Sequence, residues 1–242
     1  MNVVAAPINF GLLYGIGSVI LGQFALLSYI WWYTEFLVVT RKYEFAHAVM
    51  SHLSQFEGIF LLGIYLSVSW YGGWLPSSYY VHDGSIHWAL VGTQLIVQDA
   101  GQYVMHRIEH YWKPLYRIGH QYHHKHIHPQ WFHAFDGSIV DTCFMILVPL
   151  VITSQVVREI NTPTYIAFGT VYSISLVLIH SDFPHPWEPV FQSLLLGTSK
   201  DHQLHHQYRH CNYGHIFMWW DVLCGTYKKK ESNKKLYKKW AF

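Results

Sequence analysis

The chain has 242 residues, of which 51% are hydrophobic and only 12% are charged. Charged residues are thus about half as frequent as the roughly 25% of an ordinary soluble domain, which argues against a disordered chain and indicates a membrane protein. The net charge of +2 offers no argument for nucleic acid binding, and the length predicts a single domain over residues 1–242. The three cysteines are widely spaced and form neither a disulfide framework nor a CxxC metal pair.

Long apolar segments predict membrane-spanning helices. Residues 8–32 contain no Asp, Glu, Lys or Arg and are long enough to cross a hydrocarbon core of about 30 Å. Because this segment lacks a basic start and a small-residue cleavage site, we predict a retained anchor helix. Further candidates are residues 53–75, 86–105, 139–157 and 164–180. The last two are either two full spans or a hairpin that dips into one leaflet. The predicted fold is an all-α integral membrane protein with four to five transmembrane helices.

The basic residues predict how this bundle is oriented. Arg41 and Lys42 follow the first candidate span, whereas residues 76–85 contain no Lys or Arg. The segment after the third candidate span contains Arg107, Lys113, Arg117 and Lys125, and the basic tail at 228–242 contains seven lysines. Because short cytosolic loops carry the excess of Lys and Arg, the sequence predicts that residues 106–138 and 181–242 face the cytosol. Arg158 is the one exception, and the tail is interpreted as a solvated end near anionic lipid.

Histidine is the most informative residue type. Fifteen of the 19 histidines lie within residues 106–133 and 180–215. His106-Arg-Ile-Glu-His110 places two imidazoles on one helical face, and two HxxHH patterns follow at 120–124 and 202–206, each expected to present its rings on one helical face. Protonated imidazoles packed together would repel one another, so the clustering predicts a metal site. The predicted ligands are His106, His110, His120, His123, His124, His202, His205 and His206, with His180 and His185 as candidates to complete the set.

Two acids are predicted to lie beside the ligands. Asp99 falls on the same helical stripe as His106, and an acid in a membrane helix needs a partner or a function. We predict that it accepts an N–H bond from a ligand histidine; the alternative is that it caps a local hydrogen-bond network. Asp201 is predicted in the same supporting position next to His202. His126, His128, His133, His210 and His215 are interpreted as polar neighbours of the motifs, and His47, His52, His82 and His87 as interfacial residues.

Eight to ten histidines exceed the needs of one ion, so two metals are predicted, and imidazole ligands suit iron, zinc and copper. The Glu and Glu-x-x-His pairs of ferritin-like bundles and a HExxH zinc-hydrolase helix are both missing.

Residues 98–227, with HRIEH, HQYHH, HSDF followed by His-Pro-Trp, and HQLHH in this order, resemble the fatty acid hydroxylase/sterol desaturase superfamily of membrane di-iron enzymes. The ending, with Trp220-Asp221 and then Gly225-Thr-Tyr227, is similar to sterol-acting members. The resemblance implies a cytosolic cap that holds two iron ions, which zinc could replace in purified protein. It also implies oxygen activation with electrons from cytochrome b5 or an NAD(P)H-dependent reductase, and an endoplasmic reticulum membrane in a eukaryote. One departure weakens assignment as a desaturase: His133-Ala stands where sterol desaturases often carry His-Pro.

The predicted function is therefore the hydroxylation or desaturation of a C–H bond of a membrane lipid, with a sterol favoured. A fatty-acyl or sphingolipid hydroxylase of the same superfamily is the first alternative. A histidine-rich metal transporter is the alternative from another class, although its ligands would be expected near the membrane midplane.

Overall fold

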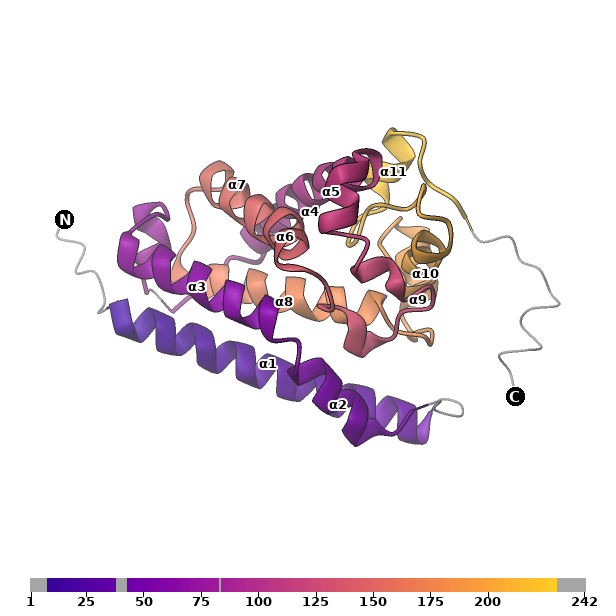
Figure 1. Ribbon diagram of the computed structural model, residues 1–242. Coiled ribbons are helices and arrows are strands. Elements are labelled where there is room, and N and C mark those ends of the chain that lie inside the picture. The colour runs from indigo at the N-terminus through magenta and orange to yellow at the C-terminus, as the bar shows by residue number, and fades with distance from the viewer. Residues whose placement is uncertain (1–7, 38–42, 83, 230–242) are drawn as a thin grey trace.

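The computed structural model describes residues 8–37, 43–82 and 84–229, and within these ranges it is helical with no β-strand (Figure 1). Helix α1 (Ile8–Phe36) runs along one side of the bundle, where it packs against α3 (Phe56–Gly72) and α8 (Thr162–Ile179). The predicted anchor at 8–32 falls within α1. The short helix α2 (Phe45–Leu53) follows the end of α1.

Helix α4 (Trp88–Tyr111) lies in the interior and packs against α7 (Val148–Val156) and α8. Its buried stripe is polar, and the neighbouring helices bond part of it, whereas the Gln94 amide and the Gln98 side-chain nitrogen have no hydrogen-bond partner among the described residues. Thr153 donates a hydrogen bond to Gln98 at 3.1 Å, and the Tyr172 hydroxyl donates one to Gln102 at 2.9 Å. Buried amides need such partners, so α7 and α8 are fixed in register against α4.

In the part of the chain that the structure describes, three helical segments are long and apolar enough to cross a membrane, namely Leu13–Phe36, Ile139–Val156 and Thr162–Ile179. The second consists of α6 (Ile139–Thr142), a π-helical turn (Cys143–Leu147) and α7. Each of the last two has 18 residues, about 27 Å of helix, so both are long enough for full spans. Helix α3 has only 17 residues and α4 carries the polar stripe, so the count of four to five spans stays a prediction.

Different segments of the chain pack at the two ends of α8. At its first residues, the Asn161 side chain donates to the Ser85 carbonyl at 2.7 Å, and the Thr162 hydroxyl donates to the Tyr79 carbonyl at 2.6 Å. This end includes the 3₁₀ turn η1 (Ser77–Tyr80). Near the last residues of α8 lie α9 (Glu188–Ser193) and α10 (Ser199–Tyr208), with α5 (Lys113–Ile118) and α11 (Trp219–Leu223) on the same side of the molecule (Figure 1). The histidine motifs are all at this second end. Residues 230–242 of the predicted basic tail lie outside the described residues.

Candidate metal centre

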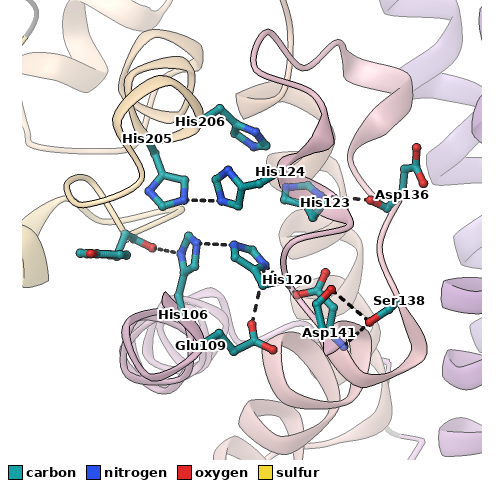
Figure 2. A network of polar contacts seen from close by, with 12 residues as sticks. His106, Glu109, His120, His123, His124, Asp136, Ser138, Asp141, His205 and His206 are labelled. Atoms are coloured by element: carbon teal, nitrogen blue, oxygen red, sulfur yellow. Dashed lines mark hydrogen bonds and ion pairs between the residues drawn. The ribbon is translucent and has the colours of Figure 1, made fainter. Parts of the chain in front are cut away.

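Nine of the ten histidines predicted as ligands converge in two groups. The five-histidine group is His106, His110, His120, His124 and His205, and the four-histidine group is His123, His180, His202 and His206. Within each group, one ring nitrogen from every member lies within 4.8 Å of the others. All nine come from the end of α4, the segment after α5, the end of α8, and α10 (Figure 2). Each group could hold a metal ion.

The two HxxHH motifs divide between the groups, which corrects the prediction that each presents its rings on one face. On α10, His202 and His206 are four residues apart and enter one group, while His205 enters the other. The segment 120–124 is not an α-helix: it consists of turns that lead into the 3₁₀ helix η2 (His123–Lys125). Neighbouring histidines in these motifs therefore serve different groups.

Backbone carbonyls orient many of these rings. The Nδ1–H of His106 donates to the Tyr213 carbonyl, and that of His205 donates to the Cys211 carbonyl, each at 2.8 Å. In the other group, His206 donates from Nδ1 to the His126 carbonyl at 2.8 Å, and His180 to the Leu176 carbonyl at 2.6 Å. A carbonyl oxygen can only accept, so each of these rings, when neutral, presents an unprotonated Nε2.

These unprotonated nitrogens face one another at short range. The Nε2 atoms of His106 and His120 are 2.9 Å apart, and those of His180 and His123 are 3.2 Å apart. All four rings use Nδ1 as a donor, so no proton is left for a bond between the facing nitrogens. Two lone pairs held this close need a cation between them.

The spacing also fits bound metal ions. Two imidazole nitrogens about 2.1 Å from one ion and at a right angle to each other would be about 3.0 Å apart. The remaining facing pairs have this separation: 3.0 Å for His205 and His124, 2.9 Å for His202 and His180, and 3.1 Å for His206 and His202. A tetrahedral angle would require about 3.4 Å, so the arrangement suits an ion with more than four ligands. Imidazole donors suit iron, zinc and copper.

The electrostatic setting favours the neutral form of most of these rings. Burial, reinforced by the neighbouring imidazoles, lowers the pKa of His202 and His206 well below the ordinary histidine value. Burial likewise lowers the pKa of His123 to about 4. Neutral imidazole is the form that binds metal ions, so the groups are ready to bind at neutral pH without first losing protons.

His185 lies outside both groups, and its contacts argue against the predicted ligand role. Its Nδ1 is 2.9 Å from the Tyr29 hydroxyl, and its Nε2 is 3.0 Å from the Ser181 hydroxyl and 3.3 Å from the Leu178 carbonyl. Both nitrogens are therefore engaged, with Nε2 as the donor to the carbonyl and Nδ1 as the acceptor from tyrosine. The ring also stacks on Trp187 with 4.9 Å between centroids.

Asp99 and Asp201 contact no histidine ring among the interactions of the described residues, contrary to the prediction. Asp99 accepts hydrogen bonds from three consecutive backbone N–H groups, at residues 215–217, and from the Trp220 indole. Asp201 forms a capping box with Thr198 at the start of α10. For Asp99 the alternative interpretation, a cap of a local hydrogen-bond network, describes its contacts.

A different acid supports a histidine of the site. Asp141 Oδ1 accepts from His120 Nδ1 at 2.7 Å, and Glu109 Oε2 is 3.7 Å from the same nitrogen (Figure 2). Asp141 is placed by the Ser138 hydroxyl, which accepts its backbone N–H at the start of α6. The sequence analysis missed this residue, although an acid inside an apolar segment was the signal that drew attention to Asp99.

A cavity adjoins both groups. Its polar wall includes His120, His123, His180 and His215. Its apolar wall consists of Ala134, Phe135, Met145, Ile146 and Leu176, from the segment after the 3₁₀ helix η3 (Trp131–His133), the π-helical turn and α8. No Lys or Arg is among the described residues that line it. The cavity therefore joins the histidine groups to a hydrocarbon-like surface.

The comparisons with known proteins agree with this site. The family model for fatty acid hydroxylases matches residues 91–226, which contain both histidine groups. The alternative squalene epoxidase of Phaeodactylum tricornutum is 39% identical over 92% of this chain and 67% of its own length.

More distant relatives match over a shorter part of the chain. They include a Δ7-sterol 5(6)-desaturase of Gibberella zeae, 29% identical over 58% of this chain, and methylsterol monooxygenase 1 of Gallus gallus, 26% identical over 58%. The chain spans about half the length of these two relatives, at 43% and 49%. No solved structure matches the chain. The family match covers more than half of the chain, and its motifs build the two histidine groups, so the chain belongs to the fatty acid hydroxylase family.

Proposed function

We propose that this protein is a membrane-bound, di-iron, oxygen-dependent oxidase of a neutral isoprenoid lipid. The observation that carries the proposal is the pair of histidine groups, with facing unprotonated nitrogens, beside a cavity whose other wall is apolar. The proposed iron ligands are the nine residues of the two groups, without His185. Bound iron would supply the reduction of O2 that oxidation of an unactivated C–H or C=C bond needs.

The residues of the chain have separate tasks in this reaction. The backbone carbonyls and Asp141 hold the imidazoles in the tautomer that presents Nε2. Met145, Ile146 and Leu176 hold the hydrocarbon part of the substrate against the histidine groups and exclude water. We expect a separate electron carrier, cytochrome b5 or an NAD(P)H-dependent reductase, because the sequence shows no heme or flavin motif.

The substrate is proposed from the cavity and the relatives together. A fatty-acyl or phosphorylated substrate would call for a cation, and no Lys or Arg lines the cavity among the described residues. A neutral hydrocarbon matches the chemistry of the apolar wall, and the relative that matches 92% of the chain is named for squalene epoxidation. Our first candidate reaction is therefore the epoxidation of squalene.

A second candidate is the hydroxylation or desaturation of a sterol C–H bond. It is supported by the sterol desaturase and methylsterol monooxygenase relatives, which match a shorter part of the chain at lower identity. The sphingolipid alternative has a relative too, the C4-hydroxylase of Schizosaccharomyces pombe at 29% identity. The absence of Lys and Arg among the described residues that line the cavity favours a neutral lipid over an anionic one.

The location is part of the proposal. We place the protein in the endoplasmic reticulum membrane of a eukaryotic cell with its histidine groups on the cytosolic side, where soluble reductase domains and NAD(P)H are available. The basic residues after the third predicted span support this orientation.

The test is expression in a microsomal host that lacks its own squalene epoxidase, followed by mass spectrometry of the neutral lipids. We expect squalene to gain one oxygen atom, and the His205→Ala variant to give no product. A sterol that gains one oxygen or loses two hydrogens, with squalene unchanged, would support the second candidate instead. Accumulated squalene with an unchanged sterol and sphingolipid profile would overturn the proposal.

A further inference from the structure

His215 belongs to neither histidine group, yet it lies between them. Its ring centroid is 5.0 Å from that of His106 in the five-histidine group and 5.2 Å from that of His202 in the four-histidine group. The side chain is only 4% exposed and lines the cavity. Its Nδ1 is buried without a hydrogen-bond partner.

The position of His215 is held from two sides. Asp99 accepts the backbone N–H of His215 at 3.2 Å and that of Ile216 at 2.8 Å. On the other side, a Cβ atom at Gly197 would be 1.8 Å from the His215 carbonyl oxygen, so only glycine permits this approach. The backbone at His215 is therefore held by hydrogen bonds to a buried acid and packs against a glycine.

The buried Nδ1 of His215 is expected to bond to a molecule that is not part of the chain. Buried polar side-chain atoms in native proteins are nearly always hydrogen-bonded, because an unpaired one is unfavourable. Among the described residues, no group satisfies Nδ1 of His215. In each group, one ring nitrogen of every histidine lies within 4.8 Å of the others, and His215 does not meet this criterion for either group. Its nitrogens are therefore poorly placed to join either set of ligands.

We propose that His215 hydrogen-bonds to a small non-protein molecule, water in the resting protein, held in the cavity between the two histidine groups. The inference rests on the proposed function, because ions bound by the two groups would hold that molecule in place. An imidazole offers an N–H donor and an acceptor nitrogen, so it suits water or a small anion that binds metal ions. His215 would act as a positioning residue, and Asp99 and Gly197 would position His215.

The test uses the iron-loaded, full-length protein in detergent, with azide as the probe and its absorption band as the readout. His215→Phe keeps a ring of similar shape but removes the hydrogen bond, and His215→Gln restores a donor and an acceptor. We expect both variants to retain the iron content of the wild type. The azide dissociation constant should rise about tenfold in His215→Phe, as expected for one lost hydrogen bond to a charged group, and largely recover in His215→Gln.

The exposed His210, whose Nδ1 donates to the Tyr208 carbonyl, is the matched control, and His210→Ala should bind azide like the wild type. If His215→Phe does not fold, His215→Leu makes the same test with less volume. Loss of iron from His215→Phe, the result expected of His205→Ala, would identify His215 as a ligand and overturn the proposal. An unchanged azide affinity in His215→Phe would overturn it as well. A wild-type protein that binds no iron would overturn the proposed function itself, which distinguishes the two failures.

Discussion

Single side chains decide which nitrogen each imidazole presents, and Asp141 does this for His120. Its carboxylate accepts the Nδ1–H at 2.7 Å, which leaves Nε2 directed at His106. Asp141→Asn keeps the volume but replaces the charged acceptor. We expect the affinity for iron to fall about 10- to 100-fold, the usual effect of losing such a partner, measured by competition with a chelator.

Asp136→Asn is the control for this experiment. The Asp136 carboxylate contacts Lys125 and His126 rather than a ring of either group, and only its backbone carbonyl accepts from His123. The variant should therefore keep the wild-type affinity. Equal losses in both variants would contradict a specific role for Asp141.

The membership of the histidine groups gives a second prediction at this scale. His205→Ala removes a member of the five-histidine group and leaves its neighbours facing one another without compensation, so we expect loss of iron and of turnover. His185 and His87 lie outside both groups, so the His185→Gln and His87→Ala variants should retain two ions. Metal analysis of the three purified variants checks this, and a His185 variant with one ion would restore that residue to the ligand set.

The histidine spacing predicted eight members of the two groups, and the place of His180 at the end of an apolar segment added the ninth, but neither identified the acid that supports them. Asp99 and Asp141 both look like acids in apolar segments, and only the tertiary structure separates them. Asp99 is 116 residues from the loop whose N–H groups it accepts, and nothing in the local sequence predicts that approach. The local sequence pattern predicts which side chains share a helical face. The partner of a buried acid, in contrast, depends on long-range packing.

Among the secondary-structure elements, α1 is attached to the segment between α8 and α9 through the ring of His185. The hydrogen bond from Tyr29 of α1 and the stack on Trp187 hold this ring at the junction. Burial lowers the pKa of His185 from 6.5 to about 4, so the ring is neutral in the folded protein. A lowered histidine pKa stabilises the fold above the unfolded value of 6.5, and this contribution is lost as the pH falls from 6.5 towards 4.

We therefore expect acid to loosen this junction. Between pH 7 and pH 5 the linkage amounts to about 2 kcal/mol, from the free energy of one pKa unit. The thermal unfolding midpoint of His185→Gln should fall less over this interval than that of the wild type. The exposed His210→Gln should behave like the wild type, and an identical pH dependence in His185→Gln would contradict the prediction.

The elements also show where helical periodicity was misleading. The pattern at 120–124 has helical spacing, but α5 ends at Ile118, and the turns that follow send His120 and His124 to one group and His123 to the other. A Cβ at Gly119 would lie 3.1 Å from both Glu109 Oε1 and the Leu115 carbonyl, so this turn is packed against α4. The same pattern on α10 is helical, and the Thr198–Asp201 capping box before it is the local signal that distinguishes the two copies.

For the molecule as a whole, we expect the two ends of α8 to lie on opposite sides of a bilayer. About 27 Å of helix separates the end at Asn161 from the end at His180. In a protein without its natural cysteines, Lys125→Cys and Lys229→Cys should react with an impermeant maleimide from the cytosolic side of sealed microsomes. Ser77→Cys should react only after the membrane is opened. Labelling of Lys125→Cys and Ser77→Cys from the same side would contradict this topology.

The division of each HxxHH motif between two groups has a consequence for the order in which ions are taken up. Helix α10 contributes His205 to one group and His202 and His206 to the other, so an ion in either group immobilises the helix that builds its neighbour. The first ion then bears the entropic loss of ordering α10, and the second binds to a helix already fixed. We expect iron uptake to be cooperative, with a sigmoidal titration curve and little singly loaded protein in native mass spectra. Two independent hyperbolic steps would show that the groups fill separately.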